Sequence, residues 1–309
     1  MPPLLPPVTI LMACHQGAAH LQEQLDTIAA QRGVDWRLVA SDDGSTDGTA
    51  AILQAFRASH PDRVRLRQGP RRGGRWGASM HFLDLLCDPD VPDGPVALSD
   101  QDDLWYPEKL KQALLHLENA QGPAIYSARS RHVTEDGRPL GPSRSFHGAA
   151  SFGNALVENR VSGHSAVLNA AALRLVRTVG PVEVPFHDWW LYLLLTGAGG
   201  EVIHDPRMML DYRQHGGNLL GAPRGALSRL ARLSRVFGPE GPAMQRANRA
   251  ALLRALPFLT PETRALLAAL DMAPRCGPLR ALRLTRLGVK RFNAAADTVL
   301  HLAATLGRV

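Results

Sequence analysis

The sequence has few cysteines and no long apolar run. Its three cysteines, Cys14, Cys87 and Cys276, are scattered and form no C-x-x-C pair. Cysteines used this sparingly give no disulfide framework, and they favour a reducing, cytoplasmic setting. No stretch approaches the roughly 18 apolar residues of a transmembrane helix, so we expect none. The proline-rich start lacks a basic segment and is therefore a poor signal peptide.

Common phosphate-binding motifs are also missing. Neither G-x-x-x-x-G-K-[ST] nor G-x-G-x-x-G occurs, which excludes a P-loop and a dinucleotide fingerprint. A loop at residues 69–77 is nonetheless rich in glycine and arginine. It is interpreted either as a solvated connection or as a loop that meets phosphates.

Acidic residues are scarce in the last part of the chain. Residues 1–221 hold 20 Lys and Arg against 24 Asp and Glu, whereas residues 222–309 hold 15 against 4. This contrast predicts a first domain over residues 1–221 and a basic, all-α extension over 222–309. Leucines at helical spacing with arginines between them predict three or four amphipathic helices in the extension. Such helices suit an anionic membrane surface, nucleic acid or an ordinary solvated face.

The first domain alternates short apolar runs with helical segments. Strands are predicted at 8–12, 36–40, 64–67, 96–98, 124–128 and 165–169, with two short late strands at 202–203 and 208–210. Helices are predicted at 18–31, 50–58, 78–86, 108–119 and 170–179, and residues 134–155 are expected to form a long loop. The order indicates an α/β fold with a mostly parallel, nucleotide-binding sheet flanked by helices.

Carboxylates follow two of the predicted strands. Asp42 and Asp43 come after the second strand, and Asp100, Asp102 and Asp103 come after the strand at 96–98. Parallel strands end at one edge of a sheet, where ligands bind. Clustered carboxylates call for a hard cation such as Mg²⁺ or Mn²⁺. Metal-assisted transfer from a nucleoside diphosphate is therefore predicted, with a solvated acidic turn as the alternative.

Four motifs, in this order, resemble the inverting glycosyltransferases of family 2, which have the GT-A fold. The motifs are D-D-G-S-T-D-G-T at 42–49, S-D-Q-D-D-L-W at 99–105, H-D-W-W at 187–190 and Y-R-Q-H at 212–215. The resemblance covers about residues 8–221. The subset of the family with these motifs is similar to bacterial rhamnosyltransferases of surface-polysaccharide pathways.

The resemblance implies a role for each motif. Asp42 and Asp43 would hold the base and ribose, with Asp100 toward the ribose or the metal's water shell, while Asp102 would ligate Mg²⁺ or Mn²⁺. Asp188 would be the general base that takes the proton of the acceptor hydroxyl. The residues implied near the diphosphate or the acceptor are His187, Trp189, Arg213 and His215.

The resemblance also implies partners. The donor would be a dTDP- or UDP-sugar, and the acceptor a glycan or a lipid-linked glycan. Contact of residues 222–309 with the inner face of the membrane would then accompany a cytoplasmic, peripheral location. Cys14-His15 and His81 depart from the family pattern, and so does Arg72-Gly73-Gly74 in the loop after the third strand. In the family these loops lie near the sugar nucleotide, so the departures leave the donor preference open.

Two other functions remain open from the residues alone. A nucleotidyltransferase of sugar-nucleotide synthesis would want a lysine in a glycine-rich N-terminal loop, and residues 13–19 contain none. A nucleic-acid-binding protein would use the basic tail, yet the tail has few aromatic residues and no recognised nucleic-acid module.

Overall fold

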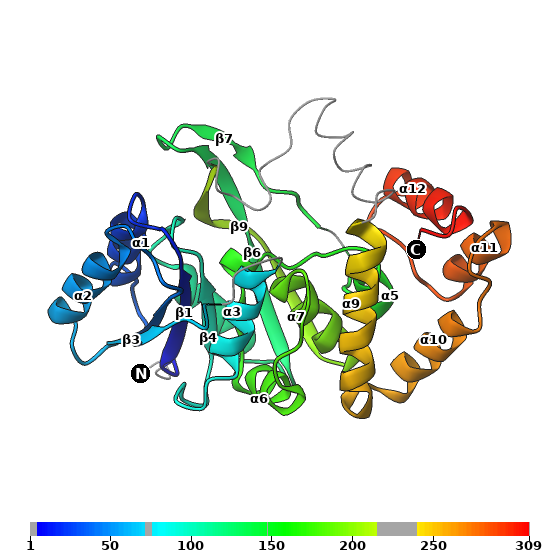
Figure 1. Cartoon of the computed structure of the whole chain (residues 1–309), viewed down its shortest axis with the longest axis horizontal. Helices are drawn as coiled ribbons and strands as arrows, with labels where there is room; N and C mark the ends of the chain where they lie inside the picture. The colour runs from blue at the N-terminus through cyan, green and yellow to red at the C-terminus, as the bar shows by residue number, and fades with distance from the viewer. Residues whose placement is uncertain (1–4, 72–75, 147, 215–239, 309) are drawn as a thin grey trace. The chain divides into compact units, whose positions relative to one another are not determined.

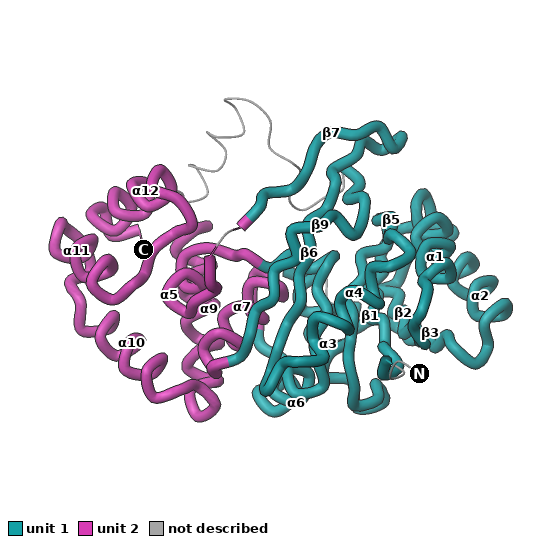
Figure 2. The backbone as a smooth tube through the Cα atoms, turned by 180° about the vertical axis from the view of Figure 1, so that it is seen from behind, with its two compact units in different colours: residues 1–145, 161–182, 200–221 teal, residues 146–160, 183–199, 222–309 magenta. Residues whose placement is uncertain are grey.

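The structure is a computed structural model that describes residues 5–71, 76–146, 148–214 and 240–308. It contains two compact units (Figure 2). Unit 1 comprises residues 1–145, 161–182 and 200–221, and unit 2 comprises residues 146–160, 183–199 and 222–309. The division into domains at residue 221 stays a prediction.

The first half of the unit 1 sheet is parallel. Its strands run in the order β3-β2-β1-β4, with β1 (Val8–Cys14), β2 (Trp36–Asp42), β3 (Val64–Gln68) and β4 (Val96–Ser99). The connecting helices are α1 (Leu21–Ala29), α2 (Thr49–Ser59) and α3 (Gly77–Leu86), which Figure 1 shows around these strands. The predicted βαβαβ half is thus present.

The second half of the sheet is mixed. β8 (Val167–Leu168) pairs antiparallel with both β4 and β6 (Ala124–Thr134), and β6 pairs in parallel with β9 (Glu201–Gln214). β5 (Leu104–Trp105) and β7 (Pro139–Pro142) are antiparallel to β9 and β6. The parallel arrangement predicted for most of the sheet therefore holds over β1–β4 and between β6 and β9, while the pairs of β8, β5 and β7 are antiparallel.

β9 is one strand of 14 residues where two short strands were predicted. The interruption expected between them contains Pro206, which has no N–H to donate to a neighbouring strand. The β6 register shifts at this point, with Ala128 opposite Asp205 and Arg129 opposite Met208. A local bulge thus accommodates Pro206, and β9 pairs with β6 both before and after it.

Alternating side chains of the strands face two helical layers. Val8, Ile10 and Met12 point to the face covered by α1, α2 and α4 (Lys109–Leu117), where they belong to one hydrophobic core cluster. α3 packs on β1 and on α6 (Ala170–Val179), and α6 contacts β6 and β8. Burial of both faces explains the continuous apolar runs of β1 and β4.

Residues 134–155 are not the uniform loop that was predicted. β6 and β7 form a hairpin whose turn contains Gly137 at φ 83°, a conformation that glycine adopts without strain. α5 (Phe152–Ala155) starts where the Ser151 side chain accepts a hydrogen bond from the Asn154 N–H. Turn and capping residues thus give short elements within a segment rich in Gly, Pro and Ser.

Unit 2 is helical in its described part. It contains α5, α7 (His187–Gly197), α9 (Glu240–Ala255), α10 (Pro261–Asp271), α11 (Pro278–Arg286) and α12 (Ala294–Thr305). The Thr260 and Asn293 side chains cap α10 and α12. Residues 240–308 thus hold four helices, while residues 215–239 lie outside the described residues. Among the described helices, none has both the length and the apolarity needed to cross a bilayer.

Candidate active site

The two acidic motifs of unit 1 lie on either side of the carboxyl end of β1. β1 pairs with β2, which leads to Asp43, and with β4, which leads to Asp100. The Asp43 N–H donates to the Cys14 carbonyl at 2.8 Å. Burial, together with the charges of Asp42 and Asp102, raises the pKa of the Cys14 thiol. The predicted meeting of the two acidic groups at one sheet edge is therefore present within unit 1.

Local hydrogen bonds fix the first acidic pair. Asp42 Oδ1 accepts from the Ser45 backbone N–H at 3.2 Å and from the Ser45 hydroxyl. Asp43 Oδ1 accepts from the Arg71 N–H at 2.5 Å. Gly69 packs directly against this residue, because a Cβ at Gly69 would lie 2.7 Å from Asp43 Cα. Both carboxylates are half-buried and held in place by loop backbone.

The second acidic group contains a buried carboxylate. Asp103 is 0% exposed, and neither of its carboxylate oxygens has a hydrogen-bond partner among the described residues. Burial raises its pKa well above the ordinary value, and the charges of Asp100 and Asp102 add to this effect. Lys109 is equally buried, with Nζ 3.4 Å from the centroid of the Trp105 ring, and burial lowers its pKa to about 7.

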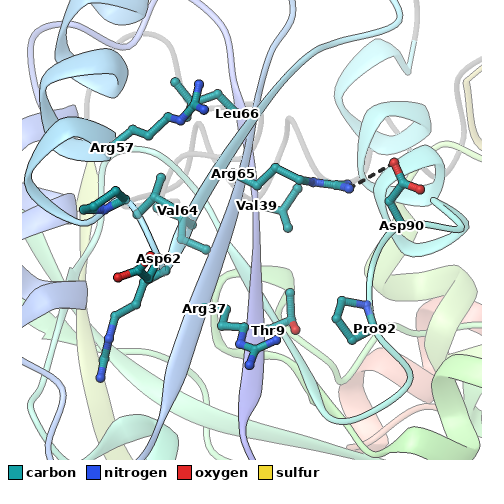
Figure 3. Close-up of a pocket in the computed structure, with 13 residues that line it drawn as sticks. Thr9, Arg37, Val39, Arg57, Asp62, Val64, Arg65, Leu66, Asp90 and Pro92 are labelled. Atoms are coloured by element: carbon teal, nitrogen blue, oxygen red, sulfur yellow. Dashed lines mark ion pairs between the residues drawn. The ribbon is translucent and has the colours of Figure 1, made fainter.

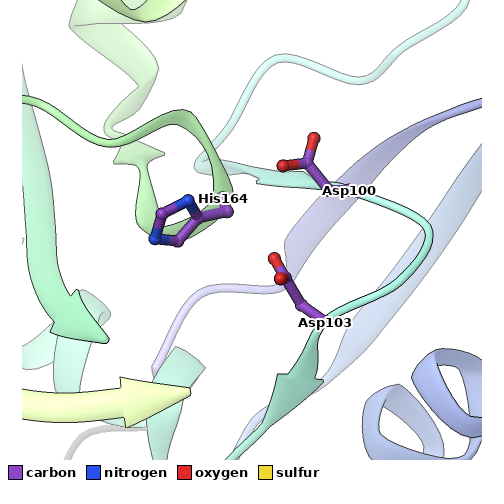
Figure 4. A group of neighbouring side chains, drawn as sticks. All are labelled: Asp100, Asp103 and His164. Carbon is purple, nitrogen blue, oxygen red and sulfur yellow. The ribbon is translucent and has the colours of Figure 1, made fainter. Parts of the chain in front are cut away.

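Asp100, Asp103 and His164 face a common space (Figure 4). Each offers a ligand atom, and these atoms lie within 4.8 Å of one another. The His164 ring stacks on Tyr212 with centroids 4.5 Å apart, and its Nε2 atom is buried without a hydrogen-bond partner in the described part of the chain. Burial, and then the charge of Lys109, lowers the pKa of His164 to about 3, which keeps the imidazole neutral.

This cluster fits a divalent cation. Two carboxylates and a neutral imidazole form an oxygen and nitrogen donor set, and the unpartnered buried atoms of Asp103 and His164 would gain a partner. Sequence reasoning did not place Asp103 or His164 at the metal. Asp102, the predicted ligand, is half-buried in the same loop, and its role stays a prediction.

Arg213 lies at the end of β9 with its side chain 5% exposed. Its guanidinium donates to the carbonyl oxygens of Asp102 and Glu135 and pairs with the Glu23 carboxylate. The predicted place of Arg213 beside the diphosphate stays a prediction. His215, predicted nearby, lies outside the described residues.

The H-D-W-W motif belongs to unit 2. Asp188 stands in the first turn of α7, half-buried, and its Oδ1 accepts from the Trp189 N–H at 2.7 Å. The Trp189 indole donates to the Ala155 carbonyl at 2.7 Å, and burial lowers the pKa of His187. The acidic groups thus belong to unit 1 and the H-D-W-W motif to unit 2, and the catalytic role of Asp188 stays a prediction.

A cavity of about 380 Å³ lies at the other edge of the parallel strands (Figure 3). Thr9, Arg37 and Val64 line it from the starts of β1, β2 and β3, and Arg65 forms an ion pair with Asp90 at 3.1 Å. None of the predicted site residues lines this cavity.

Comparison with known proteins places the chain in a family. The model of the family described as glycosyl transferase family 2 matches residues 9–176. The dTDP-rhamnosyl transferase RfbG of Shigella flexneri is 28% identical over 236 residues, which are 73% of this chain and 78% of RfbG. The putative glycosyltransferase EpsE of Bacillus subtilis is 31% identical over 113 residues, which are 37% of this chain and 39% of EpsE.

Solved structures share the fold. The mannosyltransferase PcManGT from Pyrobaculum calidifontis, in complex with GDP-Man and Mn²⁺, has a TM-score of 0.51 at 18% identity, over 97% of this chain and 85% of that chain. S. aureus TarS 1-349, in complex with UDP-GlcNAc, has a TM-score of 0.54 at 14% identity, over 96% and 89%. These likenesses confirm the predicted GT-A fold.

The family match covers more than half of the chain and includes both acidic groups of unit 1. It makes the protein a glycosyltransferase and decides against a nucleotidyltransferase. The chain belongs to glycosyl transferase family 2.

Proposed function

We propose that this enzyme transfers a sugar, with inversion, from a nucleoside-diphosphate sugar to a hydroxyl of a glycan or lipid-linked acceptor. One observation carries the proposal. Asp100, Asp103 and His164 converge at the carboxyl edge of the sheet, and the carboxylate oxygens of Asp103 and Nε2 of His164 are buried without hydrogen-bond partners among the described residues. Support comes from PcManGT, a relative in fold that was solved with GDP-Man and Mn²⁺.

Different residues of the chain bind the nucleotide, hold the metal and accept the proton. Asp42 and Asp43 bind the base and ribose, and backbone N–H groups of Ser45 and Arg71 hold their carboxylates in place. Mg²⁺ or Mn²⁺ would be held by Asp100, Asp102 and Asp103 with His164, and when bound it would neutralise the diphosphate as it leaves.

Asp188 takes the proton from the acceptor hydroxyl. The acceptor oxygen forms a bond to the anomeric carbon as the bond from that carbon to the diphosphate oxygen breaks. One base and one leaving group suffice, so the anomeric configuration inverts without a covalent enzyme intermediate. A positioned carboxylate base contributes about 10²–10⁴-fold to the rate.

The donor we propose is dTDP-rhamnose. RfbG, which is named a dTDP-rhamnosyl transferase, aligns with this chain over most of the length of both proteins. A UDP-sugar is the second candidate donor.

A thermal-shift panel tests the donor and the metal. We expect dTDP or UDP to raise the melting temperature, and Mn²⁺ or Mg²⁺ to increase that shift, followed by turnover with the matching sugar nucleotide. Asp102→Asn and Asp188→Asn should each abolish transfer while the melting temperature without ligand is retained. Asp62→Asn, at the opposite sheet edge, is the control and should keep full activity. Full activity in either site variant would refute the mechanism.

We further propose that α11 touches the inner face of the membrane. Its exposed residues Leu279, Leu282, Arg283 and Arg286 recur at the spacing of one helical face, with the two leucines 66% and 45% exposed. An apolar stripe flanked by arginines suits an anionic lipid surface. Such contact would keep a cytoplasmic enzyme beside a lipid-linked acceptor.

Vesicle flotation tests this contact. The protein should float with vesicles that contain phosphatidylglycerol, but not with pure phosphatidylcholine. Leu279→Glu combined with Leu282→Glu should abolish flotation, whereas Leu115→Glu, at a 40% exposed leucine of α4 in unit 1, should not. Equal flotation of the double variant and the wild type would contradict the proposal, as would salt-sensitive binding to random DNA without any binding to vesicles.

A further inference from the structure

Arg213 joins three separate segments of unit 1 through one guanidinium. Nε donates to the Asp102 carbonyl at 3.2 Å, Nη1 donates to the Glu135 carbonyl at 2.6 Å, and Nη2 binds the Glu23 carboxylate. These partners belong to the acidic loop, to the turn between β6 and β7, and to the first turn of α1. The rigid, planar fork of arginine suits several partners at fixed angles better than the single ammonium of lysine does.

The sheet register explains why Arg213 meets Asp102. β5 pairs with β9 so that Leu104 lies opposite Asp211 and Trp105 lies opposite Leu210. If this register is continued, Asp102 comes opposite Arg213. The strand β5 begins at Leu104, and the Arg213 side chain donates to the carbonyl of Asp102, two residues before that strand. The guanidinium therefore extends the strand pairing into the acidic loop.

The other side of the loop is held by Gln101. Its side-chain amide accepts from the His15 N–H at 2.9 Å and donates to the His15 carbonyl at 2.9 Å. Gly17 leaves room for it, because a Cβ there would lie 2.3 Å from Gln101 Oε1. The backbone around Asp102 is thus fixed from the end of β1 and from the end of β9.

We propose that Arg213 is a positioning residue, which holds the Asp102 backbone so that the loop presents its carboxylates to the metal and the diphosphate. This role rests on the proposed function, since it requires that the acidic loop binds a metal–diphosphate group. It differs from direct contact with the diphosphate, because the guanidinium would act through the Asp102 carbonyl, and its side chain is 5% exposed. The two roles make different predictions for nucleotide binding without metal.

Calorimetric titration with dTDP and UDP, each with and without Mn²⁺, separates these roles. In the wild type, Mn²⁺ should strengthen nucleotide binding. In Arg213→Ala, we expect that strengthening to fall by roughly tenfold or more, as for the loss of a charged hydrogen bond, while binding without metal is unchanged. Direct contact with the diphosphate predicts a weaker affinity in both conditions, and that result would overturn the positioning role.

Two further variants guard against a merely structural effect. Arg213→Gln keeps an amide donor toward the Asp102 carbonyl and should recover part of the Mn²⁺ effect, even if Arg213→Ala folds poorly. Glu23→Gln changes only the exposed partner on α1 and should bind like the wild type. Loss of metal-free binding in Arg213→Gln would overturn the proposal.

A double variant completes the test. If Arg213 acts through the loop of Asp102, the Mn²⁺ effect in Asp102→Asn combined with Arg213→Gln should be no smaller than in Asp102→Asn alone. A smaller Mn²⁺ effect in the double variant than in Asp102→Asn would contradict the positioning role but not the proposed function. If Mn²⁺ and Mg²⁺ did not change the nucleotide affinity of the wild type, that result would instead overturn the proposed function, and with it this role of Arg213.

Discussion

Gly69 should be intolerant of even one added methyl group. In Gly69→Ala the new Cβ would lie 2.7 Å from Asp43 Cα and 3.0 Å from Asp43 N, whereas ordinary contacts are 3.4–4 Å. The shortfall to Cα is about 0.7 Å, and both atoms are backbone, so no side chain can turn away. Overpacking of this kind costs about 1–3 kcal/mol.

The overpacking should lower either the stability of the protein or its affinity for nucleotide, and both can be measured. If the loop is rigid, urea denaturation should report a lower free energy of unfolding by that amount. If the Asp43 loop moves instead, stability is kept and affinity for dTDP or UDP should fall by roughly tenfold, because about 1.4 kcal/mol corresponds to a factor of ten.

Gly94→Ala is the matched control for this prediction. Its Cβ would come no closer than 3.9 Å, to the Pro7 carbonyl, so we expect a stability change within about 0.5 kcal/mol. If Gly69→Ala matched Gly94→Ala in both stability and nucleotide affinity, the close packing of Gly69 on Asp43 would be refuted.

Three further predictions use other parts of the chain. Gly17→Ala and Gln101→Ala should each lower the free energy of unfolding by about 1–3 kcal/mol, because each removes the two hydrogen bonds to the His15 backbone. The double variant should lose no more stability than Gln101→Ala, and additive losses in urea denaturation would count against this. Burial lowers the pKa of His81, so the folded protein binds fewer protons than the unfolded chain, and the melting temperature should fall as the pH drops below about 6.5. His81→Asn should make the melting temperature less dependent on pH in this range, and an unchanged dependence would be evidence against this prediction. Exposed Cys276 should react with a thiol reagent at pH 8 in the folded protein, whereas Cys14, whose pKa is raised by burial and by Asp42 and Asp102, should react only after denaturation.

Much of the first half of the fold could be predicted from the sequence. β1 and β4 are nearly continuous apolar runs between polar loops, and such runs are typical of strands buried on both faces. Asp42, Asp43 and the acidic loop follow two of the predicted strands, and this order predicted that they lie at one edge of the sheet. The structure agrees with this placement because local pattern and sheet topology act together there.

Other parts depend on distant pairings that local patterns do not contain. β5 has only two residues and exists through its pairing with β9, which lies about a hundred residues later. His164 reaches Asp103 because β8 pairs with both β4 and β6. A lysine such as Lys109 is expected at the surface, and only the packing against Trp105 shows that it is buried.

The division of the chain into two units has a consequence for its modularity. The backbone passes between the units five times, so unit 2 is assembled from two internal segments and the C-terminal region. The contacts inside unit 2 tie these pieces together, as the Thr260 N–H donates to the Gly197 carbonyl at 3.0 Å and the Phe292 N–H donates to Glu158 at 2.7 Å. A chimaera that exchanged only residues 222–309 with a relative would leave α5 and α7 against foreign helices. We therefore expect the helical unit to diversify by substitutions in place, or by replacement together with its inserted segments, rather than by shuffling of a tail.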